Sequence, residues 1–225
     1  MDILCTNGVK SVMLELLPEF ERARGAKIAV TWGSTNALLK DIKAGLGGDV
    51  AVLTAEAIDE LIDQGKAVAG SRVDLARSRI GVAVRKGAKQ PDIASPEALK
   101  RALIAASSVA HSQTGLSGLY FPTVLARLGI ADVMKAKIVI PDPGTPIGEV
   151  VAKGDAEIGI QQISELLPVA GIEIVGPLPA ALQKITTFSA GVLTAAKAPD
   201  VAAALVKFVA AESPRLLKQK GLEPA

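Results

Sequence analysis

Four clusters of small polar residues in this chain have the composition of an anion-binding site. Each lies where a run of β-branched residues gives way to a helical pattern of apolar residues. Hydroxyl groups and the free amides at a helix N-terminus both donate hydrogen bonds to a negatively charged ligand. The clusters supply the candidate ligand-binding residues Thr6, Asn7, Gly8, Ser34, Thr35, Asn36, Ser112, Thr114, Ser117, Gly118, Gly144 and Thr145.

The same residues have a simpler interpretation, because Ser, Thr and Asn commonly cap helices. Capping alone explains any one of the four turns. Their joint occurrence, with a glycine in each turn to allow close approach of the backbone, favours an anion site. If the strands are parallel, these turns lie at the carboxyl ends of the strands, where open α/β sheets bind ligands.

Two further side chains are candidates for the same site. His111 is the only histidine and ends a strand-like run, so it is a satisfied residue at a strand end, a ligand contact or a general base. Gln161 and Gln162 follow another such run, and because strand side chains alternate, one of them should face the ligand. We assign Gln161 to the site. With one histidine and one cysteine, we expect no metal and no cofactor.

The elements that would position these residues alternate along the chain. Strand-like runs cover residues 3–5, 27–32, 49–53, 80–84, 108–111, 137–140, 157–160 and 172–175. Helical patterns cover 9–20, 35–44, 55–64, 96–105, 117–127, 146–152 and 201–211. We expect Pro18 to kink or divide the first helix. Alternation of this kind predicts an α/β fold with mostly parallel sheets flanked by helices.

Two β-type runs, 79–85 (which contains the run 80–84) and 186–193, are not followed by a polar turn and a helix in the same way. We interpret them as two strands that connect a pair of lobes. This interpretation assigns residues 1–83 and 186–225 to a discontinuous first lobe and residues 84–185 to a second lobe. The ligand is expected in a cleft between the lobes.

The composition excludes several other classes of protein. Hydrophobic residues make up 49% and charged residues 21% of the 225 residues, which is typical of a globular protein. A net charge of +2 and only 3% aromatic residues argue against nucleic-acid binding. No apolar run approaches the roughly 20 residues of a membrane span, so no membrane insertion is expected. The N-terminus MDILCTNG lacks a signal peptide, which predicts a periplasmic protein if a leader was removed and a cytoplasmic one otherwise.

The residues also carry a resemblance to a known family. The order of the turns and the segments GGDVAVLTAEAIDELIDQGK (47–66), VVAKGDAEIGI (150–160), EIVGPLPAALQ (173–183) and VAAALVKFVAAESPRLLKQKGLEP (201–224) resemble type II periplasmic solute-binding proteins. The molybdate-binding branch of ABC transport systems is the most similar. The resemblance implies a monomer of two α/β lobes with a two-strand hinge, which closes on a small anion and delivers it to an ABC permease. It also implies that Ser34, Thr35 and residues 114–118 are ligand loops.

Two departures from the family bear on the ligand. Gly8 stands where the family has a serine, and Phe188 stands where it has a tyrosine. Losing two hydroxyl ligands argues against molybdate itself and leaves a larger di- or tricarboxylate as the alternative. The related proteins include aconitate isomerase, so an isomerase that shifts an allylic proton in a tricarboxylate is the alternative function, with His111 as its base. A ligand-sensing module that acts on a partner protein is a third interpretation.

Overall fold

The computed structural model describes residues 1–225, which divide into two compact units. Unit 1 contains Met1–Ser78 and Thr186–Ala225, and unit 2 contains Arg79–Ile185. The chain therefore passes from one unit to the other twice. The first passage comes before Arg79 rather than after residue 83, because the strand that begins at Ile80 pairs with strands of unit 2.

Unit 1 is built on a six-stranded mixed sheet in the order β11-β4-β10-β3-β1-β2. Its strands are β1 (Asp2–Thr6), β2 (Ala29–Gly33), β3 (Val50–Thr54), β4 (Val73–Ser78), β10 (Thr186–Val192) and β11 (Leu222–Pro224). β1 pairs in parallel with β2 and β3, whereas β10 runs antiparallel to β3 and β4, and β11 is antiparallel to β4. The turns after β1 and β2 therefore lie at the same end of the sheet.

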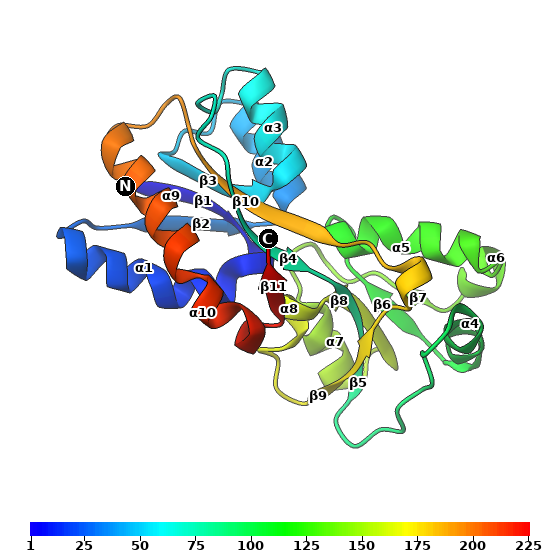
Figure 1. The fold of residues 1–225 in the computed structure, drawn as a ribbon. Coiled ribbons are helices and arrows are strands. Elements are labelled where there is room, and N and C mark those ends of the chain that lie inside the picture. The colour runs from blue at the N-terminus through cyan, green and yellow to red at the C-terminus, as the bar shows by residue number, and fades with distance from the viewer. The chain divides into compact units, whose positions relative to one another are not determined.

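Helices cover both faces of the unit 1 sheet (Figure 1). They are η1 (Asn7–Val9), α1 (Lys10–Arg24), α2 (Thr35–Lys43), α3 (Ala55–Asp63), α9 (Pro199–Glu212), α10 (Pro214–Leu217) and η3 (Lys218–Lys220). α1 packs on α9, where the rings of Phe20 and Phe208 lie 5.4 Å apart between centroids. Of the two expectations for Pro18, a kink or a division of the first helix, division is wrong, since α1 is a single helix from Lys10 to Arg24. Pro18 is exposed, so water can hydrogen-bond the carbonyl that the missing amide leaves unpaired.

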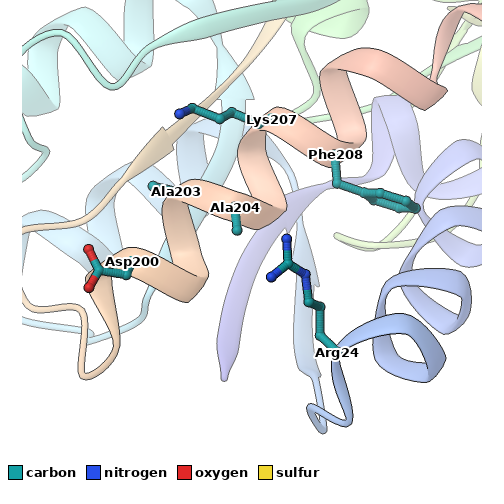
Figure 2. A pocket seen from close by; sticks show the side chains of 6 residues that line it. All are labelled: Arg24, Asp200, Ala203, Ala204, Lys207 and Phe208. Atoms are coloured by element: carbon teal, nitrogen blue, oxygen red, sulfur yellow. The ribbon is translucent and has the colours of Figure 1, made fainter.

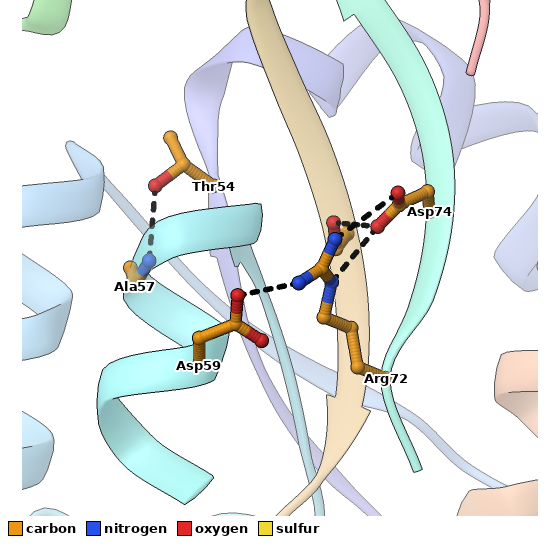
Figure 3. A network of polar contacts seen from close by, with 6 residues as sticks. Thr54, Ala57, Asp59, Arg72 and Asp74 are labelled. Atoms are coloured by element: carbon orange, nitrogen blue, oxygen red, sulfur yellow. Dashed lines mark hydrogen bonds and ion pairs between the residues drawn. The ribbon is translucent and has the colours of Figure 1, made fainter. Parts of the chain in front are cut away.

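A polar network ties α3 to the sheet of unit 1 (Figure 3). Arg72 contacts Asp59 of α3 at 2.5 Å and Asp74 of β4 at 3.0 Å. Asp74 also accepts a hydrogen bond from the Ser189 hydroxyl of β10 at 2.6 Å. The Arg72 guanidinium holds the pKa of Asp74 below its usual value. These contacts fix one helix and two strands without using any residue of the four polar turns.

Unit 2 contains a five-stranded mixed sheet in the order β7-β6-β8-β5-β9. Its strands are β5 (Ile80–Arg85), β6 (Val109–His111), β7 (Ile138–Val139), β8 (Ile158–Gln162) and β9 (Ile172–Pro177). Its helices are α4 (Pro96–Ala105), α5 (Leu116–Arg127), α6 (Ala131–Met134), α7 (Ile147–Lys153), α8 (Ile163–Leu166) and η2 (Ala180–Leu182). β6 is parallel to β7 and β8, whereas β5 is antiparallel to β8 and β9. α5 and α7 both pack on β6 and β8.

The predicted α/β fold class is confirmed, but the sheets are mixed rather than mostly parallel. The antiparallel pairs involve the strands next to the two passages between units. β5 is antiparallel to β8 and β9, and β10 is antiparallel to β3 and β4. Two strands, β4 and β11, were not predicted, since charged residues interrupt the apolar pattern of the first and the second has three residues. None of the helices combines the length and the apolar composition that a membrane-spanning helix requires.

Candidate functional site

The turns after β1 and β2 are joined by a hydrogen bond between two threonines. The Thr35 hydroxyl donates to the Thr6 hydroxyl, with 3.1 Å between the oxygens. Thr6 ends β1 and Thr35 opens α2, and the two strands bring them together because Thr6 pairs with Gly33. Both side chains are buried. This bond therefore uses one of the two hydroxyl protons within the protein and leaves the other to donate.

Gly8 lies against the ring of Phe188 in the same part of unit 1. A Cβ at position 8 would lie 2.2 Å from Cζ of Phe188, so no larger residue fits unless the ring moves. Phe188 is fully buried on β10. These two positions, at which the family pattern has hydroxyl-bearing residues, therefore form an apolar contact here.

Ser34 has a capping role. Its hydroxyl accepts a hydrogen bond from the Ala37 amide at 3.3 Å, which satisfies one of the free amides of α2. No side chain caps η1 or α1 in this way. Asn7 is half-buried and Asn36 is exposed. Of the predicted ligand-binding residues in unit 1, Ser34 is thus the one whose side chain caps a helix.

The turn between β6 and α5 is the most tightly built of the four. At Gly118 a Cβ would lie 1.9 Å from the carbonyl oxygen of Ser112, and at Gly115 it would lie 2.4 Å from the Ser112 hydroxyl. The two glycines therefore let residue 112 press against the first turn of α5. The buried Ser112 hydroxyl has no hydrogen-bond partner, and Gly115 provides no side-chain cap for α5. Ser117 is buried in the first turn of α5, and Thr114 is exposed.

His111 lies directly before this turn. Its Nδ1 is 3.1 Å from the carbonyl oxygen of Ser112, and its ring packs against Phe121 with centroids 5.5 Å apart. Because a carbonyl oxygen only accepts, Nδ1 must carry the proton, which leaves Nε2 of the neutral ring as an acceptor. Burial lowers the pKa of His111, although the hydrogen bond to Ser112 opposes this shift. The geometry is therefore that of a neutral imidazole with one basic nitrogen.

The fourth predicted turn leads into α7. Gly144 has φ +90°, a conformation that favours glycine, and the Thr145 amide donates to the Asp142 carbonyl at 3.1 Å. Helix α7 begins at Ile147, with Pro146 as the N-cap residue. Thr145 is half-buried.

Gln161 links α7 to α8 through its side-chain amide. Oε1 accepts from the Ile147 amide at 3.1 Å, and Nε2 donates to Oε2 of Glu165 at 3.0 Å. Sequence reasoning missed Glu165. Burial raises the pKa of Glu165 to about 7, and the hydrogen bond from Gln161 offsets only part of the shift. Both ends of the Gln161 amide are thus engaged within unit 2.

A separate hollow on unit 1, of about 590 Å³, lies between α1 and α9. It is lined by Arg24, Asp200, Ala203, Ala204, Lys207 and Phe208. Figure 2 shows the Arg24 guanidinium reaching from the end of α1 toward α9. The hollow contains none of the predicted ligand residues, so it is distinct from the polar turns.

Comparison with known proteins decides the family. A family described as bacterial extracellular solute-binding proteins matches residues 1–223. The chain belongs to this solute-binding family. The resemblance to type II solute-binding proteins of the molybdate-binding kind is therefore confirmed.

Three relatives of this solute-binding protein are informative. It is 35% identical over 233 residues to an aconitate isomerase of Pseudomonas sp, covering 100% of this chain and 87% of that protein. It is 28% identical over 156 residues to the molybdate-binding protein ModA of Azotobacter vinelandii, covering 68% and 61% of the two chains. The solved structure of the Azotobacter vinelandii periplasmic molybdate-binding protein superposes with a TM-score of 0.82 at 19% identity, covering 100% and 99%. This last likeness concerns the fold alone.

Proposed function

We propose that this solute-binding protein binds a small carboxylate anion, and that the turn between β6 and α5 forms part of the binding site. The observation that carries this proposal is the Ser112 hydroxyl, which is buried beside the first turn of α5 without a hydrogen-bond partner. An unpartnered buried hydroxyl is costly unless a ligand completes its hydrogen bonding. The uncapped start of α5 adds amide donors and a partial positive charge for an anion.

A carboxylate fits the hydroxyl inventory better than a tetrahedral oxyanion does. The Thr35–Thr6 pair uses one hydroxyl proton internally, and the Gly8–Phe188 contact is apolar, whereas the Ser34 hydroxyl only accepts from the Ala37 amide and keeps its own proton. A tetrahedral oxyanion needs hydrogen-bond donors on every side. The loss of hydroxyl donors in unit 1 therefore weakens the binding of a tetrahedral oxyanion more than the binding of a flat carboxylate group. Closure of the two lobes, export from the cytoplasm and delivery to an ABC permease remain predictions from the family.

Titration calorimetry with trans-aconitate, cis-aconitate and citrate tests the role of Ser112. A hydrogen bond to a charged ligand contributes about 1.5–3 kcal/mol, so Ser112→Ala should weaken binding roughly 10- to 100-fold. The matched control is Ser213→Ala, because the Ser213 hydroxyl is also buried without a partner but lies at the end of α9. Equal affinities of wild type and Ser112→Ala would remove Ser112 from the site.

We infer a second candidate function from His111 and the aconitate isomerase relative, which is an isomerase acting on an unsaturated tricarboxylate. Nε2 of His111 takes a proton from the methylene carbon of trans-aconitate. A proton is then returned to the other end of the allylic system and the double bond moves, so the overall composition of the substrate is unchanged. A neutral imidazole with a lowered pKa suits this general-base role at neutral pH.

Proton NMR of trans-aconitate in the presence of the protein tests this second function. We expect formation of cis-aconitate, with a rate about 10²–10⁴-fold lower in His111→Gln. In D2O, exchange of the migrating proton would show up as loss of its signal. Absence of turnover by the wild type would contradict the isomerase function and leave ligand binding as the proposed function. Full turnover by His111→Gln would show that another group is the base.

A further inference from the structure

The structure has a feature that ligand binding does not use, which is a groove of about 280 Å³ between α1 and the edge strand β2 of unit 1. Leu14 and Pro18 line it from the helix, and Val30 and Trp32 line it from the strand. The Leu14 side chain is 55% exposed. Exposed apolar side chains that gather in one groove commonly mark an interaction surface.

β2 is also an open edge of the sheet. It is last in the strand order and pairs only with β1, so its outer side presents unpaired backbone amides and carbonyls. Natural edge strands are commonly protected by a proline, a charged residue or a bulge. The β2 sequence Ala-Val-Thr-Trp-Gly has neither a proline nor a charge, and its register with β1 is regular.

The two ends of the groove carry opposite charges. Nζ of Lys10 lies 5.4 Å from the centroid of the Trp32 ring, at the carboxyl end of β2. Oε1 of Glu21 accepts the Ile28 amide at 2.7 Å, just before β2 begins. α1 therefore runs antiparallel to β2, with a cation at one end of the groove and an anion at the other. Lys10 opposes the dipole of its own helix, so a partner anion would relieve an unfavourable charge.

We propose that this groove is a homodimer interface, in which β2 pairs antiparallel with β2 of a second copy about a two-fold axis near Val30. An antiparallel arrangement places Lys10 of each copy opposite Glu21 of the other, and Leu14 of both copies at the centre. A two-fold operation brings each charged end of the groove opposite the end of opposite charge in the second copy, and two-fold symmetry is the commonest symmetry of dimers. A monomer was the expectation from the family resemblance, and this proposal replaces it.

Sedimentation velocity over a wide dilution series tests the interface. The wild type should form a dimer that dissociates on dilution. Leu14→Glu and Lys10→Glu should each weaken the dimer about tenfold or more, since Lys10→Glu turns two attractive charge pairs into repulsive ones. The charge swap Lys10→Glu with Glu21→Lys should restore it. The matched control is Val133→Glu, because Val133 of α6 is 54% exposed outside this groove.

Circular dichroism melts of each variant separate loss of the dimer from loss of the fold. Slow hydrogen exchange of the β2 amides in the dimer, and fast exchange in Leu14→Glu, would support the strand pairing. A wild-type protein that stays monomeric at all concentrations would overturn the proposal. A dimer of unchanged strength in both Leu14→Glu and Lys10→Glu would overturn it as well.

Discussion

The hydroxyl of Thr35 donates a hydrogen bond to the hydroxyl of Thr6 across 3.1 Å, which joins the first two polar turns of unit 1. The two residues are 29 positions apart, and both side chains are buried. A hydroxyl at a strand-to-helix turn thus serves the fold by bonding a second hydroxyl rather than by capping a helix. The contact also reduces the number of donors that unit 1 offers to an anion.

Removing both members of the threonine pair should cost less than the sum of the costs of removing each one alone. Thr35→Val leaves the buried Thr6 hydroxyl without its donor, which we expect to lower the free energy of unfolding by about 1–3 kcal/mol. Thr35→Ser keeps the donor and serves as the control. In the double variant Thr6→Val with Thr35→Val neither hydroxyl is left unpaired, so its loss should be smaller than the sum of the two single losses. Urea denaturation of the wild type, Thr6→Val, Thr35→Val, the double variant and Thr35→Ser measures these losses, and additive single losses would show that the hydrogen bond has no coupling energy.

Gly118→Ala should destabilise unit 2 and weaken ligand binding together. The added methyl group would lie 1.9 Å from the Ser112 carbonyl oxygen, so the backbone of the β6–α5 turn must move. Overpacking of this kind typically costs about 1–3 kcal/mol. Gly47→Ala is the control, because no atom lies within 4 Å of the new methyl group there. If thermal unfolding and titration calorimetry gave equal values for the two variants, the close approach at Gly118 would have no energetic importance.

Glu165→Gln should change how stability depends on pH. The pKa of Glu165 is about 7 in the folded protein, above its ordinary value of 4.5, so the folded state binds more protons between these pH values. The free energy of unfolding contributed by this group therefore falls as pH rises from 4.5 to 7. With partial solvent access, we expect Glu165→Gln to be more stable than wild type by about 2 kcal/mol at about pH 8 and nearly equal to it at about pH 4.

Denaturant titrations across this pH range measure the effect of Glu165, and exposed Glu149→Gln in α7 serves as the control. Parallel stability curves for wild type and Glu165→Gln would contradict the raised pKa.

Asp49 should stabilise unit 1 only while it is ionised. Its two carboxylate oxygens accept the amides of Asp2 and Lys197, each at 2.7 Å. Burial favours the neutral acid, but these hydrogen bonds outweigh it and lower the pKa of Asp49. The contribution is therefore fully present above the ordinary value of 3.8 and is lost as pH falls through the lower folded pKa. Asp49→Asn should cost about 1.5–3 kcal/mol at neutral pH, since a hydrogen bond to a charged group is lost.

Urea denaturation of Asp49→Asn and of exposed Asp63→Asn at neutral and acidic pH checks this expectation. We expect the gap between wild type and Asp49→Asn to narrow in acid. A gap that is independent of pH would show that the carboxylate charge has no part in the contact.

Much of the fold follows from local sequence pattern, whereas several contacts of the candidate site do not. The strand-to-helix alternation predicted the four turns, because periodicity and turn residues are local signals. The pair of Thr6 and Thr35 depends on the register of β1 and β2, which no local pattern specifies. Glu165 follows Gln161 by four positions, but Gln161 lies on β8, so the helical spacing rule does not apply to the pair. The residue patterns of β5 and β10 predict strands, but the antiparallel direction of these strands depends on the path of the chain, which the local pattern does not specify.

The measurement that tests the central claim most directly is a thermal denaturation panel on the wild-type protein. The ligands are trans-aconitate, cis-aconitate, citrate, molybdate, tungstate and sulfate. A ligand at about 100 times its Kd adds about 2.7 kcal/mol to the stability of the native state. We predict a higher Tm with at least one carboxylate and an unchanged Tm with the tetrahedral oxyanions. A higher Tm with molybdate or tungstate, and none with any carboxylate, would contradict the proposal.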